Sequence, residues 1–148
     1  MKRKNTTASE PEGVRQRLTD LRVALLKLHK ALVDSERVGY EKTIGKIRSP
    51  GHFLQLLTND PWFAWLQPLS QLIVSIDEAT EAKEPLTSTW VDATAKQTRS
   101  LLTPSESSEG FARHYFDALQ RDPDVVIAHG AVIKALGPLK QKGDNRPT

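Results

Sequence analysis

A heptad-like row of aliphatic side chains marks the beginning of the chain. Its members recur at alternating spacings of four and three residues, and they are Val14, Leu18, Leu21, Leu25, Leu28 and Leu32. This spacing places them along one face of an α-helix, so the pattern predicts a long amphipathic helix over residues 13–47. The row ends after Leu32, where Ser35 and Gly39 occupy its continuation. A row that ends this early favours an intramolecular bundle over a long coiled-coil dimer.

The densest apolar segment of the chain lies in residues 61–83. It is apolar on nearly all sides between Trp62 and Ile76, which predicts a buried helix at the centre of the fold. Pro68 lies inside this segment and lacks the N–H of a helical hydrogen bond, so we expect a kink one turn before it. The kink has two interpretations: a bend that wraps the core, or the opening of a pocket beside Trp62 and Trp65.

The remaining helices share one start signal, a capping residue followed by proline. The pairs are Ser49-Pro50, Asp60-Pro61, Thr103-Pro104 and Asp122-Pro123. The capping oxygen can accept a free N–H of the first turn, where the missing N–H of proline costs nothing. Gly137 followed by Pro138 is a stop signal. The predicted helices after the first one span residues 50–57, 61–83, 88–102, 104–120 and 123–136.

These helices predict the fold class, because no convincing pair of strands accompanies them. We expect an all-α, single-domain helical bundle of four to five main helices with a kinked central helix. A chain of 148 residues has the usual size of one domain, and 38% hydrophobic residues suffice for a core. The bundle is predicted over residues 13–138, between disordered polar tails at 1–12 and 139–148.

Several features of composition bear on compartment. The absence of cysteine excludes a disulfide scaffold and sites that bind metal through cysteine. The basic residues at the N-terminus are not followed by an apolar segment, so we expect no secretory signal. The apolar run in residues 62–76 is too short and too polar for a membrane span. We therefore expect a cytoplasmic protein with no membrane partner.

The net charge of +3 hides a strong polarisation along the chain. Residues 13–48 carry nine basic and four acidic side chains, whereas residues 49–95 carry one basic and six acidic side chains. One interpretation is a basic first helix that packs beside an acidic neighbour. The other is a basic surface for an acidic partner or for nucleic acid. Aromatic residues are not interleaved with the basic ones, which argues against nucleic acid.

The four histidines are the natural candidates for chemistry, and they are His29, His52, His114 and His129. Hemerythrin-like bundles use pairs of histidines four residues apart, and di-iron carboxylate bundles use repeated Glu-x-x-His; neither pattern occurs in this sequence. We therefore predict no metal and no cofactor. A nucleotide loop and a serine nucleophile motif are also missing. Two of the three residues His29, Glu36 and Asp117 could form a general acid–base pair, provided that the fold brings them together.

If the fold contains a pocket, we expect it where the flank of the first helix meets the kink. The candidate pocket residues are His29, Glu36, Tyr40, Trp62, Trp65 and Pro68. His52, His114 and Asp117 are secondary candidates.

Two segments of the sequence are distinctive, DPWFAWLQPLSQLIVSIDE and FARHYFDALQRDPDVVIAHG. They resemble an uncharacterised bacterial family of small all-helical proteins with no assigned activity. The resemblance covers residues 14–136. It implies a bacterial origin and a single domain, and it transfers no site residues.

The sequence favours a non-enzymatic cytoplasmic binding or assembly module, acting as a homodimer or with a protein partner. Its surface would be the polarised first helix or an apolar groove beside Trp62 and Trp65. One alternative is a metal- or small-molecule-binding bundle, hemerythrin-like in architecture only, built on His29, Glu36, His114 and His52. Another alternative is nucleic-acid binding through the basic first helix and the tails.

Overall fold

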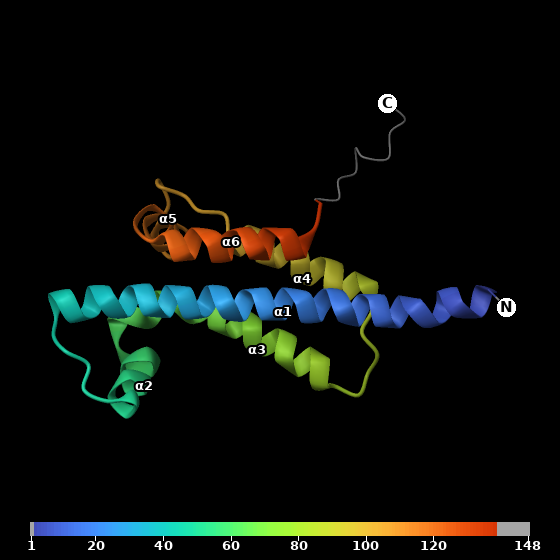
Figure 1. Ribbon diagram of the computed structural model, residues 1–148, viewed down its shortest axis with the longest axis horizontal. Coiled ribbons are helices and arrows are strands. Elements are labelled where there is room, and N and C mark those ends of the chain that lie inside the picture. Colours follow the sequence, from blue (N-terminus) through green and yellow to red (C-terminus); the bar gives the residue numbers. More distant parts are fainter. Residues whose placement is uncertain (1, 139–148) are drawn as a thin grey trace.

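The long helix α1 (Lys2–Thr43) is the element against which the rest of the chain packs. The computed structural model describes the backbone of residues 2–138 and the side chains of residues 12–138. Figure 1 shows α6 (Pro123–Leu136) on one side of α1, and α2 (Pro50–Asn59) and α3 (Gln67–Glu81) on the other. The leucines of the predicted row, from Leu18 to Leu32, are all buried along α1. The prediction that residues 61–83 form the central helix was therefore wrong, because α1 holds that position.

α1 differs from its predicted bounds at both ends. It begins at Lys2, whereas the sequence predicted a start near Gly13 after a polar tail. Pro11 and Gly13 do not end the helix, because each residue added to an existing helix contributes a hydrogen bond that can offset one weak position. The helix ends at Thr43 rather than near Ile47, and a loop leads on to α2. The predicted tail at 139–148 lies outside the described residues.

The segment predicted as one kinked helix is two helices, the 3-10 helix η1 (Pro61–Leu66) and α3. Pro68 lies in the first turn of α3, a position at which proline is well tolerated. The irregularity expected beside Pro68 takes the form of a change from 3-10 helix to α-helix between Leu66 and Gln67. α3 is also buried on one face only, because Val74 is 52% exposed while Leu69 and Ile76 are buried.

Three of the four predicted start signals are confirmed. The Ser49 hydroxyl accepts the His52 N–H at 3.0 Å, and Asp60 and Asp122 cap η1 and α6 in the same way. The start at Thr103 was wrong: its hydroxyl donates to the Arg99 carbonyl, 2.7 Å away, in the last turn of α4 (Ser88–Leu101). This bond back to the preceding turn competes with a cap.

A loop then leads to α5 (Phe111–Arg121), which begins seven residues later than the predicted 104. Gly110 opens this helix and Gly137 ends α6, each with a positive φ that disfavours other residues. The predicted stop at Gly137 is thus confirmed.

The basic first helix lies beside acidic neighbours, as one interpretation of the charge pattern predicted. Arg22 on α1 pairs with Asp77 on α3, and Arg17 pairs with Asp92 on α4 at 3.0 Å. Helix α4 also contacts α3 and α6, which closes the bundle around the leucine row. The protein is an all-α single domain, and the described residues form no strand. Among the described helices, none combines the length and the apolar character needed to cross a bilayer.

Candidate functional site

Three of the predicted pocket residues meet, but they fill space rather than line a pocket. The Trp62 indole Nε1–H donates to the Glu36 carbonyl oxygen at 3.2 Å. Its ring lies so close to α1 that a Cβ on Gly39 would come within 3.3 Å of Cζ2. Tyr40 meets the same indole edge-on, with 5.8 Å between ring centroids. The groove expected beside Trp62 is therefore occupied by packed side chains.

The aromatic packing continues from Tyr40 through η1 to α2. The Tyr40 and Phe63 ring centroids lie 5.7 Å apart, and those of Phe63 and Phe53 lie 5.8 Å apart. Phe63 is fully buried at the centre of this group. The rings join α1, η1 and α2 into one packed unit, which fixes the position of α2 against the C-terminal part of α1.

The Glu36 carboxylate is buried and paired with an arginine that the sequence did not indicate. Glu36 is 8% exposed, and the Arg121 guanidinium donates to its Oε2 at 2.5 Å. The same guanidinium donates to the Ser35 hydroxyl at 3.1 Å. Since the two partners are 85 positions apart, no local pattern could have revealed the pair. It anchors the end of α5 to α1, so Glu36 has a structural role.

The other three pocket candidates lie in separate surroundings. His29 is two helical turns from Glu36, about 10 Å along α1, and its Nε2 shares a hydrogen bond with the Ser70 hydroxyl at 3.0 Å. Burial lowers the pKa of His29, which favours the neutral ring. Trp65 packs toward α5, against Phe111. Pro68 lines a different hollow, between α3 and α4.

The secondary candidates do not converge either. His114 is exposed and stacks on Trp65, with 5.1 Å between centroids, and Asp117 pairs with Arg113 on the same helix. His52, in the first turn of α2, accepts the Arg48 backbone N–H through Nδ1 at 3.0 Å. Within residues 12–138, no group of three or more histidines and carboxylates comes close enough to hold a metal. The residues named for the metal-binding alternative are therefore not clustered in this part of the chain.

A pair that sequence reasoning missed joins α5 to α6. The Tyr115 hydroxyl and His129 Nδ1 lie 2.6 Å apart, and Tyr115 is fully buried. Burial raises the pKa of the Tyr115 phenol and lowers the pKa of His129. Tyr115 lies on the buried face of α5 with Ala118, and His129 lies between the buried Val125 and Val132 along α6. Two consecutive helices separated only by Asp122 are the signal that could have suggested their contact.

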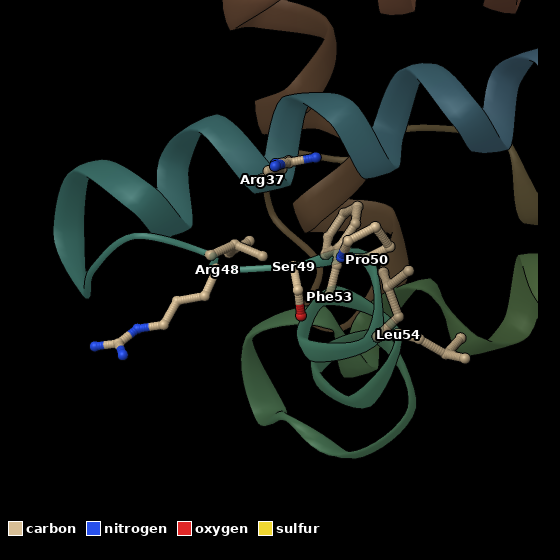
Figure 2. Close-up of a pocket in the computed structure, with 8 residues that line it drawn as sticks. Arg37, Arg48, Ser49, Pro50, Phe53 and Leu54 are labelled. Atoms are coloured by element: carbon tan, nitrogen blue, oxygen red, sulfur yellow. The ribbon is translucent and has the colours of Figure 1, made fainter.

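A hollow near these aromatic rings lies between α1 and α2, and the sequence did not indicate it. Its volume is about 450 Å³, and Figure 2 shows it beneath α1. It is lined by Arg37, Ile47, Arg48, Ser49, Pro50, Phe53, Leu54 and Leu57. Most of the lining is apolar, and the two arginines supply its charge. The capped turn at Ser49 shapes it by directing the chain from the end of α1 into α2.

Arg37 is the arginine of this hollow that stacks on an aromatic ring. Its guanidinium carbon lies 4.8 Å from the centroid of the Phe53 ring, so a cation–π contact holds it over the apolar floor. The nearest carboxylate oxygen, on Glu41, is 3.9 Å from Arg37 Nε. Within residues 12–138 the Arg37 guanidinium donates no hydrogen bond to a protein acceptor. Its planar set of N–H donors is thus available to an incoming acceptor.

The surroundings of the hollow are basic. Residues 37–48 contain four basic side chains, Arg37, Lys42, Lys46 and Arg48, against the single carboxylate of Glu41. That carboxylate is engaged, because its Oε2 accepts the Ile47 N–H at 2.9 Å. Figure 2 shows the Arg48 side chain extending away from the hollow, toward solvent. The region therefore presents an apolar depression within a positive potential.

Comparisons of the chain with protein-family models, with curated proteins and with solved structures gave no match. The resemblance to a bacterial helical family thus stays a prediction. What the protein does is inferred from geometry alone.

Proposed function

We propose that the protein is a non-enzymatic binding module that holds an acidic, partly apolar segment of a partner protein in the hollow between α1 and α2. The observation that carries this proposal is Arg37, fixed over Phe53 at the edge of an apolar depression. Among the described residues no carboxylate forms a hydrogen bond with it. A carboxylate of the partner would find a positioned guanidinium, with its donors in the geometry that suits bidentate pairing.

The apolar part of the partner follows from the floor of the hollow. Phe53 and Leu57 are partly exposed there, and Leu54 beside them is 65% exposed. A hollow of about 450 Å³ accommodates one or two large side chains. A leucine or phenylalanine next to an aspartate or glutamate would satisfy the floor and the arginine together.

A peptide segment fits this surface better than a small molecule does. Small-molecule sites are concave and enclose most of their ligand. Here Leu54, which lines the depression, is 65% exposed, so the depression is open to solvent on that side. A longer chain can cover that leucine while it places one side chain in the hollow, so the exposed area favours a polypeptide partner.

This proposal keeps one of the surfaces suggested by the sequence and drops the other. The basic C-terminal part of the first helix is retained, because Arg37 belongs to it. The groove beside Trp62 is dropped, because Gly39 and Tyr40 pack against that indole. A bacterial source and a cytoplasmic location stay expectations of the sequence.

Selection from a random peptide library displayed on phage, with the full-length protein as bait, tests the proposal. We expect enriched peptides to combine Asp or Glu with Leu or Phe. Arg37→Gln should weaken binding of an enriched peptide about tenfold or more, since hydrogen bonds to charged groups are the stronger ones. Arg113→Gln, at an exposed arginine on α5, is the matched control and should bind normally.

Two results would overturn the proposal. One is enrichment of peptides without acidic residues. The other is unchanged affinity in a folded Arg37→Gln variant, with thermal unfolding used to establish that it is folded. Added salt should also weaken binding, because the arginine is partly exposed and its attraction is screened.

A further inference from the structure

The hollow between α1 and α2 has its cation and its apolar floor in direct contact. The Arg37 guanidinium carbon lies 4.8 Å from the centroid of the Phe53 ring, and Figure 2 shows Arg37 on α1, above Phe53. A ligand that uses both groups must therefore present a carboxylate and an apolar group close together. This condition limits which part of a partner polypeptide can occupy the hollow.

Two side chains of an extended peptide meet this condition poorly. Successive side chains point to opposite faces, so an acidic residue and its apolar neighbour reach the arginine and the floor together only if the backbone turns between them. Side chains two positions apart share a face, but they start about 7 Å apart along the chain. The C-terminal residue of a polypeptide carries its side chain and its α-carboxylate on the same Cα. It meets the condition without a turn.

The surroundings of Phe53 suit the end of a chain. Phe63 is fully buried behind Phe53, with 5.8 Å between the two ring centroids, and Tyr40 of α1 packs on Phe63. The hollow is open on another side, where Leu54 is 65% exposed. A partner chain that enters over Leu54 thus meets packed rings behind Phe53.

We propose that this hollow recognises the C-terminal residue of its partner, with an apolar side chain on Phe53 and the α-carboxylate on Arg37. This inference rests on the proposed function and narrows its ligand to a chain end with a free carboxylate. Within residues 12–138 no carboxylate forms a hydrogen bond with the Arg37 guanidinium. Two of its N–H groups can therefore hold the two oxygens of the terminal carboxylate. The volume of about 450 Å³ accommodates a terminal leucine or phenylalanine.

The second arginine of the hollow has a different role. Arg48 lines the hollow as well, but Figure 2 shows its side chain extending away toward solvent. It adds to the positive potential that attracts any anion. Arg37 instead holds a carboxylate beside the apolar floor. Discrimination of a chain end therefore depends on Arg37 and not on Arg48.

Two N-acetylated peptides of the sequence Gly-Ser-Gly-Ser-Gly-Leu test the inference, one with a free C-terminal carboxylate and one with a C-terminal amide. NMR titration of the isotope-labelled full-length protein measures both affinities. The free acid should bind at least about tenfold more tightly, because hydrogen bonds to charged groups are the stronger ones. A free acid that ends in glycine instead of leucine should bind about tenfold more weakly, because it leaves the floor uncovered.

Two variants assign the discrimination to one side chain. Arg37→Gln should bring the free acid and the amide to nearly the same affinity, because the carboxylate loses its positioned partner. Arg48→Gln is the matched control and should leave the ratio of the two affinities within about twofold, because an exposed arginine acts through a screened attraction. Thermal unfolding establishes that both variants are folded. A ratio that Arg37→Gln leaves unchanged would overturn the role of Arg37.

A third peptide separates this inference from the proposed function. It is the N-acetylated amide Gly-Ser-Gly-Asp-Leu-Gly, whose only carboxylate is the aspartate side chain, and it should bind several-fold more weakly than the free acid. If it binds as tightly, or if the first free acid and its amide bind equally, recognition of the chain end is overturned while the proposed function stands. If none of these peptides binds up to about 10 mM and the peptide selection also fails, both proposals are overturned.

Discussion

The indole N–H of Trp62 donates its hydrogen bond to the carbonyl oxygen of Glu36 on α1, 3.2 Å away. This carbonyl lies inside a helix, so the bond is additional to the regular helical one. It fixes the indole across Gly39 and thereby sets the distance between η1 and α1. The sequence associated Trp62 with a pocket, but the Trp62 indole fills the space between η1 and α1.

Gly39→Leu tests this close packing. The leucine Cβ would lie 3.3 Å from Cζ2 of Trp62, and its remaining atoms would need space that the indole fills. We expect a loss of about 1–3 kcal/mol in the free energy of unfolding, as for other overpacked cores. Chemical denaturation followed by tryptophan fluorescence measures it. Gly13→Leu, where a Cβ meets nothing within 4 Å, should cost no more than a few tenths of a kcal/mol.

The ion pair between Glu36 and Arg121 gives a second prediction. Arg121→Met leaves a nearly buried carboxylate without its strongest partner, so we expect a loss of about 1–3 kcal/mol. Adding Glu36→Gln to Arg121→Met should recover part of the loss, and a double-mutant cycle measures the coupling. The exposed pair of Arg113 and Asp117 is the comparison, and Arg113→Met should cost below about 0.5 kcal/mol. Equal losses in the two arginine variants would contradict the structural role of Glu36.

Titration of the two partly buried histidines, His29 and His129, predicts a dependence of stability on pH. Burial lowers the pKa of His29 and of His129 below the ordinary value of 6.5. The unfolded chain therefore binds protons first as the pH falls below about 6.5, and the free energy of unfolding decreases. Above that pH this contribution is fully present. Denaturation at a series of pH values should show a shallower decline for His29→Gln and the shallowest for the double variant with His129→Gln.

Local signals of the sequence were sufficient for most of the fold. The cap at Ser49 and the stop at Gly137 depend on neighbouring residues only, and both are confirmed. The leucine row likewise predicted the inner face of α1. These signals can be recognised in the sequence because the hydrogen bonds and contacts that produce them join residues only a few positions apart.

The candidate site depended on distant contacts, and for that reason the sequence predicted it poorly. Glu36 was correctly placed beside Trp62, but its partner Arg121 is 85 positions away and belongs to no pattern. In the sequence Arg37 does not differ from the other arginines of the helix, because its contact with Phe53 depends on how α2 packs against α1. Trp65 and Pro68 were assigned to one pocket with Trp62, although η1 and α3 direct them toward α5 and α4.

Pro68→Ala distinguishes the observed helix boundary from the kinked helix that the sequence predicted. Proline is well tolerated in the first turn of α3, so alanine should change the free energy of unfolding by less than about 0.5 kcal/mol. In the interior of one continuous helix the same change would stabilise the protein by as much as about 3 kcal/mol. A matched contrast is Ser75→Pro, in the body of α3, which should cost about 3 kcal/mol or more because an interior N–H is lost. Denaturation of the three proteins under one condition measures both differences. A strong stabilisation by Pro68→Ala would support one continuous kinked helix. A small effect at Pro68, together with a large effect at Ser75, would support the boundary between η1 and α3 at Leu66 and Gln67.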